Sequence, residues 1–169
     1  SYLQVSSEIG ILAIGVALLM ISGEFDLSIG SLIGFSSMSV TLLTVEASLS
    51  MPVASILTLI MVMFIGYCNG RTVVKSGLPS FIITLGSLFM VRGITIAVSK
   101  MVTGRTQLGG LEESKGYNIM SSLFSNSLTI SETDFPISIL WWVLFGILGY
   151  LLLKHTQIGN WIFATGASK

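Results

Sequence analysis

The sequence predicts an all-α integral membrane protein, a polytopic helical bundle with about five transmembrane segments, one of which is a broken helix. Two observations carry this prediction. Hydrophobic residues make up 52% of the 169 residues and charged residues only 9%, whereas a soluble domain carries about 25% charged residues. The apolar residues also gather into long runs, and a helix needs about 20 such residues to cross the hydrocarbon core of a bilayer.

Five runs qualify as membrane segments. The first is apolar but short, the second is rich in Ser and Gly, and the third begins with Pro52, which the first turn of a helix tolerates. The last contains Trp141 and Trp142, which we expect to anchor it at the membrane interface, with ordinary helix packing as the alternative. The predicted segments are residues 9–22, 27–45, 52–68, 78–98 and 137–153.

The loops predict the orientation, because short cytoplasmic loops carry an excess of Lys and Arg. Arg71 and Lys75 lie in one short loop without an acid, and Lys154, His155 and Lys169 follow the last segment. Counting segments places both stretches on one side, which we assign to the cytoplasm. The long polar stretch, residues 99–136, then forms an extracytoplasmic loop that can hold a short helix. Glu8 and Glu46 lie on the same side as this loop.

The stretch GEFDLSIG, residues 23–30, interrupts the first apolar region. Residues 9–45 are too long for one span and short for two, which predicts a break between two helices. Gly23 can end the first helix, and Asp26 can cap the next by accepting hydrogen bonds from the amides near Ser28 and Ile29. A break at membrane depth must be covered by protein or face a cavity. The alternative is a plain cytoplasmic turn.

Polar side chains also occur inside the fourth segment. Ser80, Thr84, Ser87 and Thr95 share a narrow arc of that helix, which indicates either hydrogen bonding between helices or a face that lines a polar pathway. Arg92 lies about two turns from the predicted outer end of the helix. It is either a snorkelling or paired structural residue, with Glu8 or Glu46 as its partner, or a pathway residue.

Glycines are frequent in the predicted helices, and we expect them to let neighbouring backbones approach closely. They are Gly10, Gly15, Gly30, Gly34, Gly66, Gly86, Gly93, Gly146 and Gly149.

The sequence gives no support for catalysis. It contains no HExxH, GxSxG or Walker A pattern. Cys68 is the only cysteine and His155 the only histidine, so neither a disulfide nor a metal site is expected. The formal net charge is +0, which argues against nucleic acid. We expect no enzyme activity and no cofactor in this chain, so that any energy it uses must come from a partner or an ion gradient.

Four stretches together resemble a known family. GEFDLSIGSLIGF is similar to the signature G-G-I-D-L-S-V-G-S, with Glu24 and Phe25 as departures. NGRTVVKSGLPSFIITLGSLFMVRGI and ITIAVSKMVTG are similar to a cytoplasmic hairpin, the helix after it and the start of an extracytoplasmic loop. KHTQIGNWIFATGASK is similar to T-x-x-G-R-x-x-Y-A-x-G-G-N. These motifs resemble the permease subunits of bacterial ABC sugar importers of the ribose/xylose type.

The resemblance implies one permease domain over residues 1–169, covering about half of a full permease. It implies the transmembrane subunit of an ATP-driven importer that carries a pentose or hexose across the bacterial cytoplasmic membrane. The expected partners are ATP-binding cassette ATPase subunits, which bind the ATP, a periplasmic sugar-binding protein and a second permease subunit in a homodimer. A branched-chain amino acid or nucleoside permease and a non-transporting membrane fragment are the alternatives. Together with the polar arc of the fourth segment, the resemblance gives the candidate pathway or structural residues, which are Asp26, Leu27, Ser28, Gly30, Thr84, Ser87 and Arg92.

The last stretch leads, in this family, into the helix that docks on the ATPase. Thr156, Gly159, Ala164 and Gly166 match the pattern and form the expected coupling region. Asn160, Phe163, Ala167 and Ser168 stand where Arg, Tyr, Gly and Asn are usual, which leaves the strength of docking open. Because the chain lacks an initiator Met and stops after an apolar patch, we expect it to be an internal piece of a longer protein.

Overall fold

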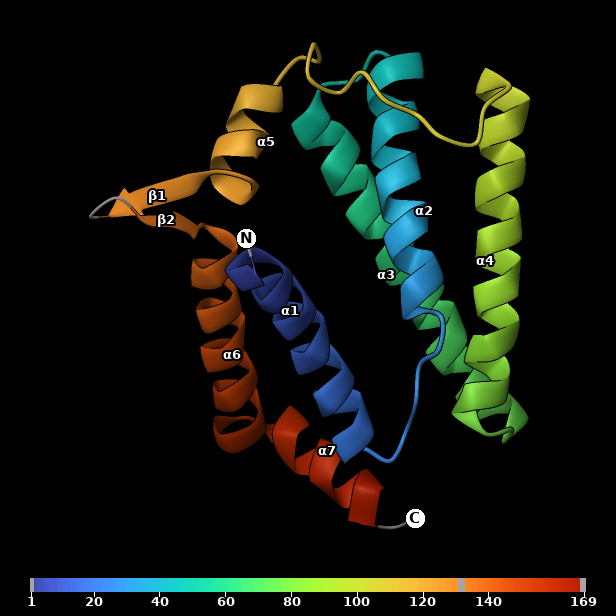
Figure 1. Ribbon diagram of the computed structural model, residues 1–169. Coiled ribbons are helices and arrows are strands. Elements are labelled where there is room, and N and C mark those ends of the chain that lie inside the picture. Colours follow the sequence, from blue (N-terminus) through green and yellow to red (C-terminus); the bar gives the residue numbers. More distant parts are fainter. Residues whose placement is uncertain (1, 131–132, 168–169) are drawn as a thin grey trace. The chain divides into compact units, whose positions relative to one another are not determined.

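The computed structural model describes residues 2–130 and 133–167, so Ser168 and Lys169 lie outside the described residues. Its elements, in chain order (Figure 1), are α1 (Tyr2–Ile21), α2 (Ile29–Thr41), the π-helix η1 (Leu42–Glu46), α3 (Met51–Ser76), α4 (Ser80–Thr103), α5 (Tyr117–Phe124), β1 (Ser127–Ile130), β2 (Thr133–Pro136), α6 (Ser138–His155) and α7 (Gln157–Ala167). Five helical stretches are long and apolar enough to cross a membrane, namely α1, α2 with η1, α3, α4 and α6. The five predicted segments are therefore confirmed.

The chain is apolar outside and rich in hydroxyl groups inside. Among the described residues, the buried hydrophobic side chains are Ala54 and Val91, whereas ten buried side chains belong to Ser or Thr. Large apolar side chains such as Phe64 and Phe89 are about two-thirds exposed. Lipid is as apolar as Leu, so helices in a membrane associate through small residues and hydroxyl groups. This pattern is that of a membrane protein.

One compact unit comprises residues 26–120 and contains α2, η1, α3 and α4. Helix α2 contacts both α3 and α4. Helices α2 and α4 run parallel, with α3 antiparallel to both (Figure 1). The α3–α4 turn, with Arg71 and Lys75 close before it, therefore lies at the opposite end of this unit from Glu46 and Thr103.

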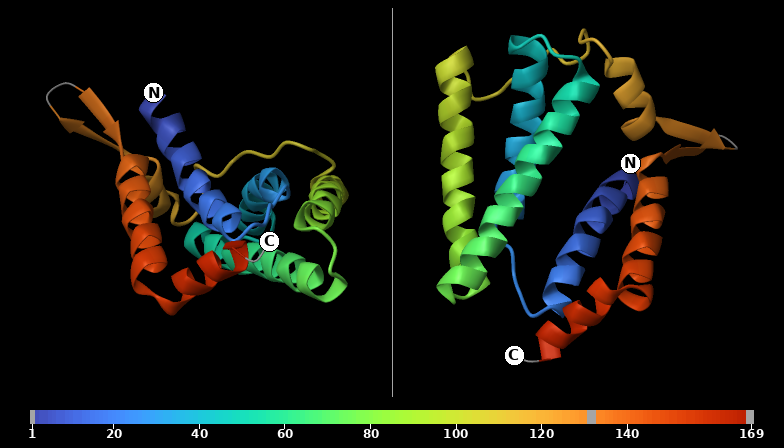
Figure 2. Two further views of the ribbon diagram at one scale, coloured as in Figure 1. Left: turned by 90° about the horizontal axis from the view of Figure 1, so that it is seen from below. Right: turned by 180° about the vertical axis from the view of Figure 1, so that it is seen from behind.

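The other unit comprises residues 1–25 and 121–169. Helices α1 and α6 lie side by side and parallel (Figure 2). Ser7 and Ser138, near the starts of these helices, share a buried hydrogen bond of 2.6 Å. Further along, a Cβ on Gly10 would overlap the Trp142 indole, and a Cβ on Gly149 would lie 3.1 Å from Ile14.

The close approach predicted for glycines is thus confirmed where α1 meets α6. It is wrong for the glycines at which an added Cβ would meet no atom within 4 Å, because no described neighbour packs against them. These are Gly15, Gly30, Gly34, Gly66, Gly86 and Gly93.

Three helices are longer than predicted, because polarity marks where a helix leaves the apolar region and not where its hydrogen bonding stops. Helix α1 already begins at Tyr2, α3 continues past Cys68 to Ser76, and α4 continues past Val98 to Thr103. The last two end at Gly77 and Gly104, with φ of 67° and 72°, the left-handed conformation that Gly adopts at little cost.

The polar stretch predicted as a loop has structure of its own. It contains the short helix α5, as allowed, and an antiparallel hairpin in which Ser127 pairs with Pro136 and Leu128 with Phe135. The Trp141 indole donates a 2.9 Å hydrogen bond to the Leu123 carbonyl and stacks on Phe124. Both tryptophans of the pair thus take part in packing; their role as interfacial anchors stays a prediction.

Candidate functional site

The break begins where α1 ends, at a Schellman motif centred on Gly23. The amide of Gly23 donates to the Met20 carbonyl and that of Glu24 to the Leu19 carbonyl, at 3.0 and 3.2 Å. Gly23 has φ of 80°. This is the geometry in which a left-handed glycine satisfies the last carbonyls of a helix. The prediction that Gly23 ends the first helix is confirmed.

Asp26 organises the start of α2. Its Oδ1 atom accepts hydrogen bonds from the Ser28 amide at 2.7 Å and from the Ser28 hydroxyl at 2.6 Å. Ser28 is fully buried, so its polar groups depend on these partners. The predicted acceptor role of Asp26 is confirmed toward Ser28.

The break is also tied to both helices that flank α2. The Leu27 amide donates to the Thr84 hydroxyl of α4 at 3.1 Å, and the Asn69 side chain of α3 donates to the Ser28 hydroxyl at 3.3 Å. We call Asp26, Leu27, Ser28, Asn69 and Thr84 the break cluster. Four of these five residues were predicted as functional, and they come together from three separate parts of the chain.

The break cluster lies inside the helical unit. Asn69 precedes the end of α3 at Ser76 by about two turns, and Thr84 follows the start of α4 by about one. Figure 1 shows the start of α2 set back from the α3–α4 turn. This geometry favours a break covered by protein over a plain turn at the end of the bundle.

Arg92 lies at the middle of α4, about twelve residues or 18 Å from either end. The expectation that it lies two turns from the outer end is wrong, because α4 continues to Thr103. An Arg side chain cannot reach the end of the helix from this position, which removes snorkelling as its explanation. An intramembrane Arg that cannot snorkel faces protein or a water-filled cavity, or it costs about 2.5–3.5 kcal/mol on insertion scales.

Glu46 is not the partner of Arg92. It lies at the end of η1 beside Val102 and Arg105, about three turns along α4 from Arg92. Glu8 belongs to the other unit and accepts a hydrogen bond of 3.1 Å from Gln4.

Arg92 lines a groove between α2 and α4, which we call the Arg92 groove, with a volume of about 440 Å³. Its polar lining comes from Arg92, Thr95 and Ser31. Gly30 and Gly34 form part of the α2 wall, and a Cβ on either would meet no protein atom within 4 Å. These glycines leave open space beside a central cation. No carboxylate is among the described residues that line the groove.

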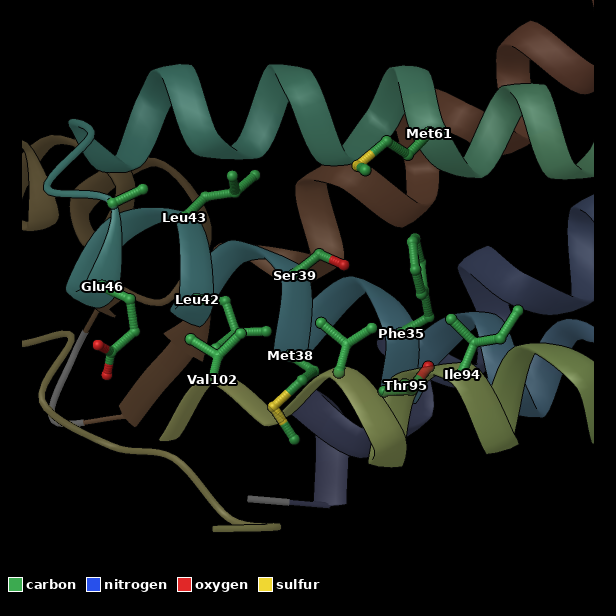
Figure 3. Close-up of a pocket in the computed structure, with 12 residues that line it drawn as sticks. Phe35, Met38, Ser39, Leu42, Leu43, Glu46, Met61, Ile94, Thr95 and Val102 are labelled. Carbon is green, nitrogen blue, oxygen red and sulfur yellow. The ribbon is translucent and has the colours of Figure 1, made fainter. Parts of the chain in front are cut away.

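An apolar cavity of about 490 Å³ continues from the groove along the same pair of helices (Figure 3). It shares Phe35, Met38 and Thr95 with the Arg92 groove and ends at Glu46. Figure 3 shows the Glu46 carboxylate at one end, beside Val102. The cavities therefore follow the α2–α4 contact from its middle to one end.

The predicted polar arc of α4 divides between two roles. Thr84 is buried and accepts from Leu27 while donating to the Ser80 carbonyl. Thr95 donates to Val91 in its own helix and lines the Arg92 groove. Ser87 is half-buried. The hydrogen bond of Thr84 joins α4 to the break and not to another helix, and the pathway role of Thr95 stays a prediction.

The predicted coupling residues build the junction of α6 and α7. The Thr156 hydroxyl donates to the Leu152 carbonyl at 2.6 Å and accepts from the Gly159 amide at 3.2 Å, which caps α7. A Cβ on Gly159 would overlap the carbonyl groups at the end of α6, and one on Gly166 would overlap the Ile21 carbonyl of α1. Ala164 is exposed. Their role in coupling stays a prediction.

Asn69 and the π-helix were missed as features of the site. Asn69 was expected in a loop, and only its place on the extended α3 brings it to Ser28. A π-helix has no signature in the hydrophobic pattern, although such turns often occur at functional sites. Nothing in the described ranges groups three side chains suited to a metal ion.

The five long apolar helices, their exposed apolar side chains and their buried Ser and Thr residues define a multi-pass α-helical membrane protein. A family model described as "Branched-chain amino acid transport system / permease component" matches residues 1–169, and the chain belongs to this family of transport permeases.

Curated relatives agree with this assignment. The chain is 26% identical over 162 residues to the autoinducer 2 import system permease protein LsrD of Salmonella typhimurium, covering 95% of this chain and 46% of the relative. It is 32% identical over 173 residues to the xylose/arabinose import permease protein XylH of Sulfolobus acidocaldarius, covering 98% and 44%. It is 36% identical over 94 residues to the xylose transport system permease protein XylH of Escherichia coli, covering 56% and 24%.

The chain thus spans about half the length of the first two relatives. No solved structure matches it significantly.

Proposed function

We propose that the chain is part of the transmembrane subunit of an ATP-driven importer that carries a monosaccharide across the cytoplasmic membrane. The observation that carries this proposal is the Arg92 groove, which places an Arg in an open and otherwise largely apolar groove at the middle of a membrane-spanning helix. The names of the relatives, which include importers of xylose, arabinose and autoinducer 2, support a sugar as the solute. In this proposal, separate ATPase subunits bind and hydrolyse the ATP.

In this proposal the break cluster is the structural element and the Arg92 groove is the solute-facing element. Arg92 presents hydrogen-bond donors to hydroxyl oxygens of the solute. Thr95 and Ser31 also line the groove. Their hydroxyl groups donate to backbone carbonyls and can still accept hydrogen bonds from the solute. Gly30 and Gly34 leave open space beside them. The side bearing Arg71 and Lys75 faces the cytoplasm, so residues 99–136 face outward and meet a periplasmic sugar-binding protein.

A branched-chain amino acid is the second candidate, because the matched family carries that description. An amino acid brings a carboxylate that Arg92 would bind and an ammonium group that needs an acceptor. The described lining of the groove offers no carboxylate for that ammonium. This lining favours a neutral, hydroxyl-rich solute.

The α6–α7 junction is the proposed coupling region, with Thr156, Gly159, Ala164 and Gly166 as its residues. The Thr156 cap and the contact of Gly166 with α1 support it, because they fix α7 against two membrane helices. A homodimer of permease subunits would present two such regions to two ATPase subunits. Motion of the ATPases would then reach α1 and α6 through α7.

Uptake by cells that carry the native gene tests the function. Deleting the gene should abolish uptake of one labelled sugar among D-xylose, L-arabinose and D-ribose and leave uptake of L-leucine unchanged. Co-purification with an ATPase whose activity rises with a sugar-loaded binding protein would support coupling. Loss of leucine uptake, with sugar uptake intact, would establish the second candidate instead.

A further inference from the structure

A second polar pocket lies at the far end of the α2–α4 contact, away from the break cluster. It has a volume of about 390 Å³, and its polar side chains are Glu46 and Thr41 from the α2–η1 stretch and Thr103 and Arg105 from the end of α4. We call it the Glu46–Arg105 pocket. It touches the apolar cavity, since Glu46 and Val102 line both.

The Arg105 backbone is fixed without help from its side chain. The Ser99 hydroxyl donates to the Arg105 carbonyl at 2.7 Å, and the Arg105 amide donates to the Thr103 hydroxyl at 3.1 Å. Gly104, with φ of 72°, makes the turn between Thr103 and Arg105. The guanidinium group is exposed and is not needed to hold this turn.

Glu46 is positioned by the π-helix that it ends. Five residues, Leu42–Glu46, form η1, and the Ala47 amide donates to the Leu42 carbonyl at 3.2 Å. Ser48 follows with φ of 54°, a strained conformation for a residue with a side chain. In the part of the chain that the structure describes, the Glu46 carboxylate and the Arg105 guanidinium make no hydrogen bond or ion pair.

We propose that the Glu46–Arg105 pocket is a reception site for a neutral, polyhydroxylated solute before it reaches the Arg92 groove. The inference rests on the proposed function and adds a second binding position to it. A carboxylate accepts and a guanidinium donates hydrogen bonds, and sugar hydroxyl groups do both. The two charges sum to zero, so the pocket as a whole does not favour a solute that carries a net charge.

The continuity of the cavities favours a sugar over an amino acid in this pocket. A zwitterion would fit between Glu46 and Arg105, but the apolar cavity and the Arg92 groove beyond it offer its ammonium group no further described carboxylate. A polyol instead finds hydroxyl and guanidinium groups at both positions. The apolar cavity between the positions limits binding there, so that the solute is held at two separate points.

Binding to the purified protein in lipid nanodiscs tests the proposal apart from transport. Saturation-transfer NMR would follow D-xylose, L-arabinose, D-ribose and L-leucine as probes. The protein measured carries Arg92→Leu, so that the Arg92 groove does not contribute to binding. At least one sugar should bind to it, and adding Glu46→Gln or Arg105→Gln should weaken that binding about tenfold or more, because each removes a charge-assisted hydrogen bond. Glu113→Gln and Lys100→Gln, which change exposed charges outside the pocket, serve as matched controls and should leave binding unchanged.

Binding of none of the sugars, or binding that survives both pocket variants, would overturn the reception site. So would binding of leucine that depends on the same two residues. If Glu46 and Arg105 instead formed a structural ion pair, each single charge reversal would lower the unfolding temperature and the double reversal would restore it. The proposal predicts that the unfolding temperature changes little in all three of these variants. If the protein binds sugar as expected but deletion of the gene leaves sugar uptake unchanged, the proposed function is contradicted and the binding site is not.

Discussion

The backbone amide of Leu27 donates a hydrogen bond of 3.1 Å to the Thr84 hydroxyl, which joins two segments that are 57 residues apart in the chain. Thr84 is buried, and its hydroxyl also donates to the Ser80 carbonyl of its own helix. A backbone amide of irregular structure at membrane depth needs such a partner, because lipid supplies none. The bond therefore fixes the start of α2 on α4.

Replacing Thr84 with Val should destabilise the protein by about 1–3 kcal/mol, because the Leu27 amide loses its acceptor. Thr84→Ser keeps the hydroxyl and should behave nearly as the wild type. Thr72→Val is the control, since the Thr72 hydroxyl is exposed and donates to Cys68 within its own helix. Thermal unfolding in detergent would compare them. Equal stability of Thr84→Val and Thr72→Val would contradict the role of this bond.

Asp26→Ala should abolish uptake or assembly, because it removes both acceptor contacts to Ser28. We expect a loss of about 1–3 kcal/mol in stability. Asp26→Asn keeps an oxygen acceptor and should retain part of the activity, and Glu113→Ala removes an exposed acid as a control. Wild-type uptake by Asp26→Ala at normal expression would show that the break cluster is not required.

Gly34→Ala and Gly10→Ala should act in opposite ways. At Gly34 the new Cβ meets no protein atom, and Ala favours a helix over Gly by up to about 1 kcal/mol. Stability should hold or rise while uptake falls, because the methyl group enters the Arg92 groove. At Gly10 the Cβ overlaps the Trp142 indole, and stability should fall by about 1–3 kcal/mol. Unchanged uptake for Gly34→Ala would argue against a solute in the groove.

Gly166→Ala should uncouple transport from ATP hydrolysis, because its Cβ would displace α7 from the Ile21 carbonyl of α1. Ala164→Ser lies on the same helix at an exposed position and is the matched control. The measurement is ATPase activity of the assembled complex with sugar-loaded binding protein. Stimulation at the wild-type level in Gly166→Ala would contradict the proposed coupling region.

Hydropathy predicted the five spans because apolar run length is a local property of the chain. It failed at the ends of α3 and α4, because Gly77 and Gly104 end these helices and not the first polar residues. The error in the predicted end of α4 then led to a wrong position for Arg92 in the candidate site. It placed Arg92 near a helix end and made Glu46 a potential partner, whereas the longer helix places them about three turns apart.

The break itself was predictable, since Gly23 and Asp26 act on neighbours within five residues of themselves. The contacts of the break with Asn69 and Thr84 were not, because they depend on how α3 and α4 pack on α2. The open space beside Gly30 and Gly34 likewise depends on how the helices pack and could not be predicted from the sequence. From the sequence these glycines predicted close helix contact, and the structure places a groove there.

The central claim is that Arg92 faces the solute path. The most direct measurement is the stability and the sugar uptake of Arg92→Leu, measured side by side, with Arg92→Lys and Arg92→Gln for comparison. An unpartnered Arg at the centre of a span is costly, so Arg92→Leu should be at least as stable as the wild type and should lose uptake. Wild-type uptake, or a fall in stability that accounts for the lost uptake, would contradict the claim.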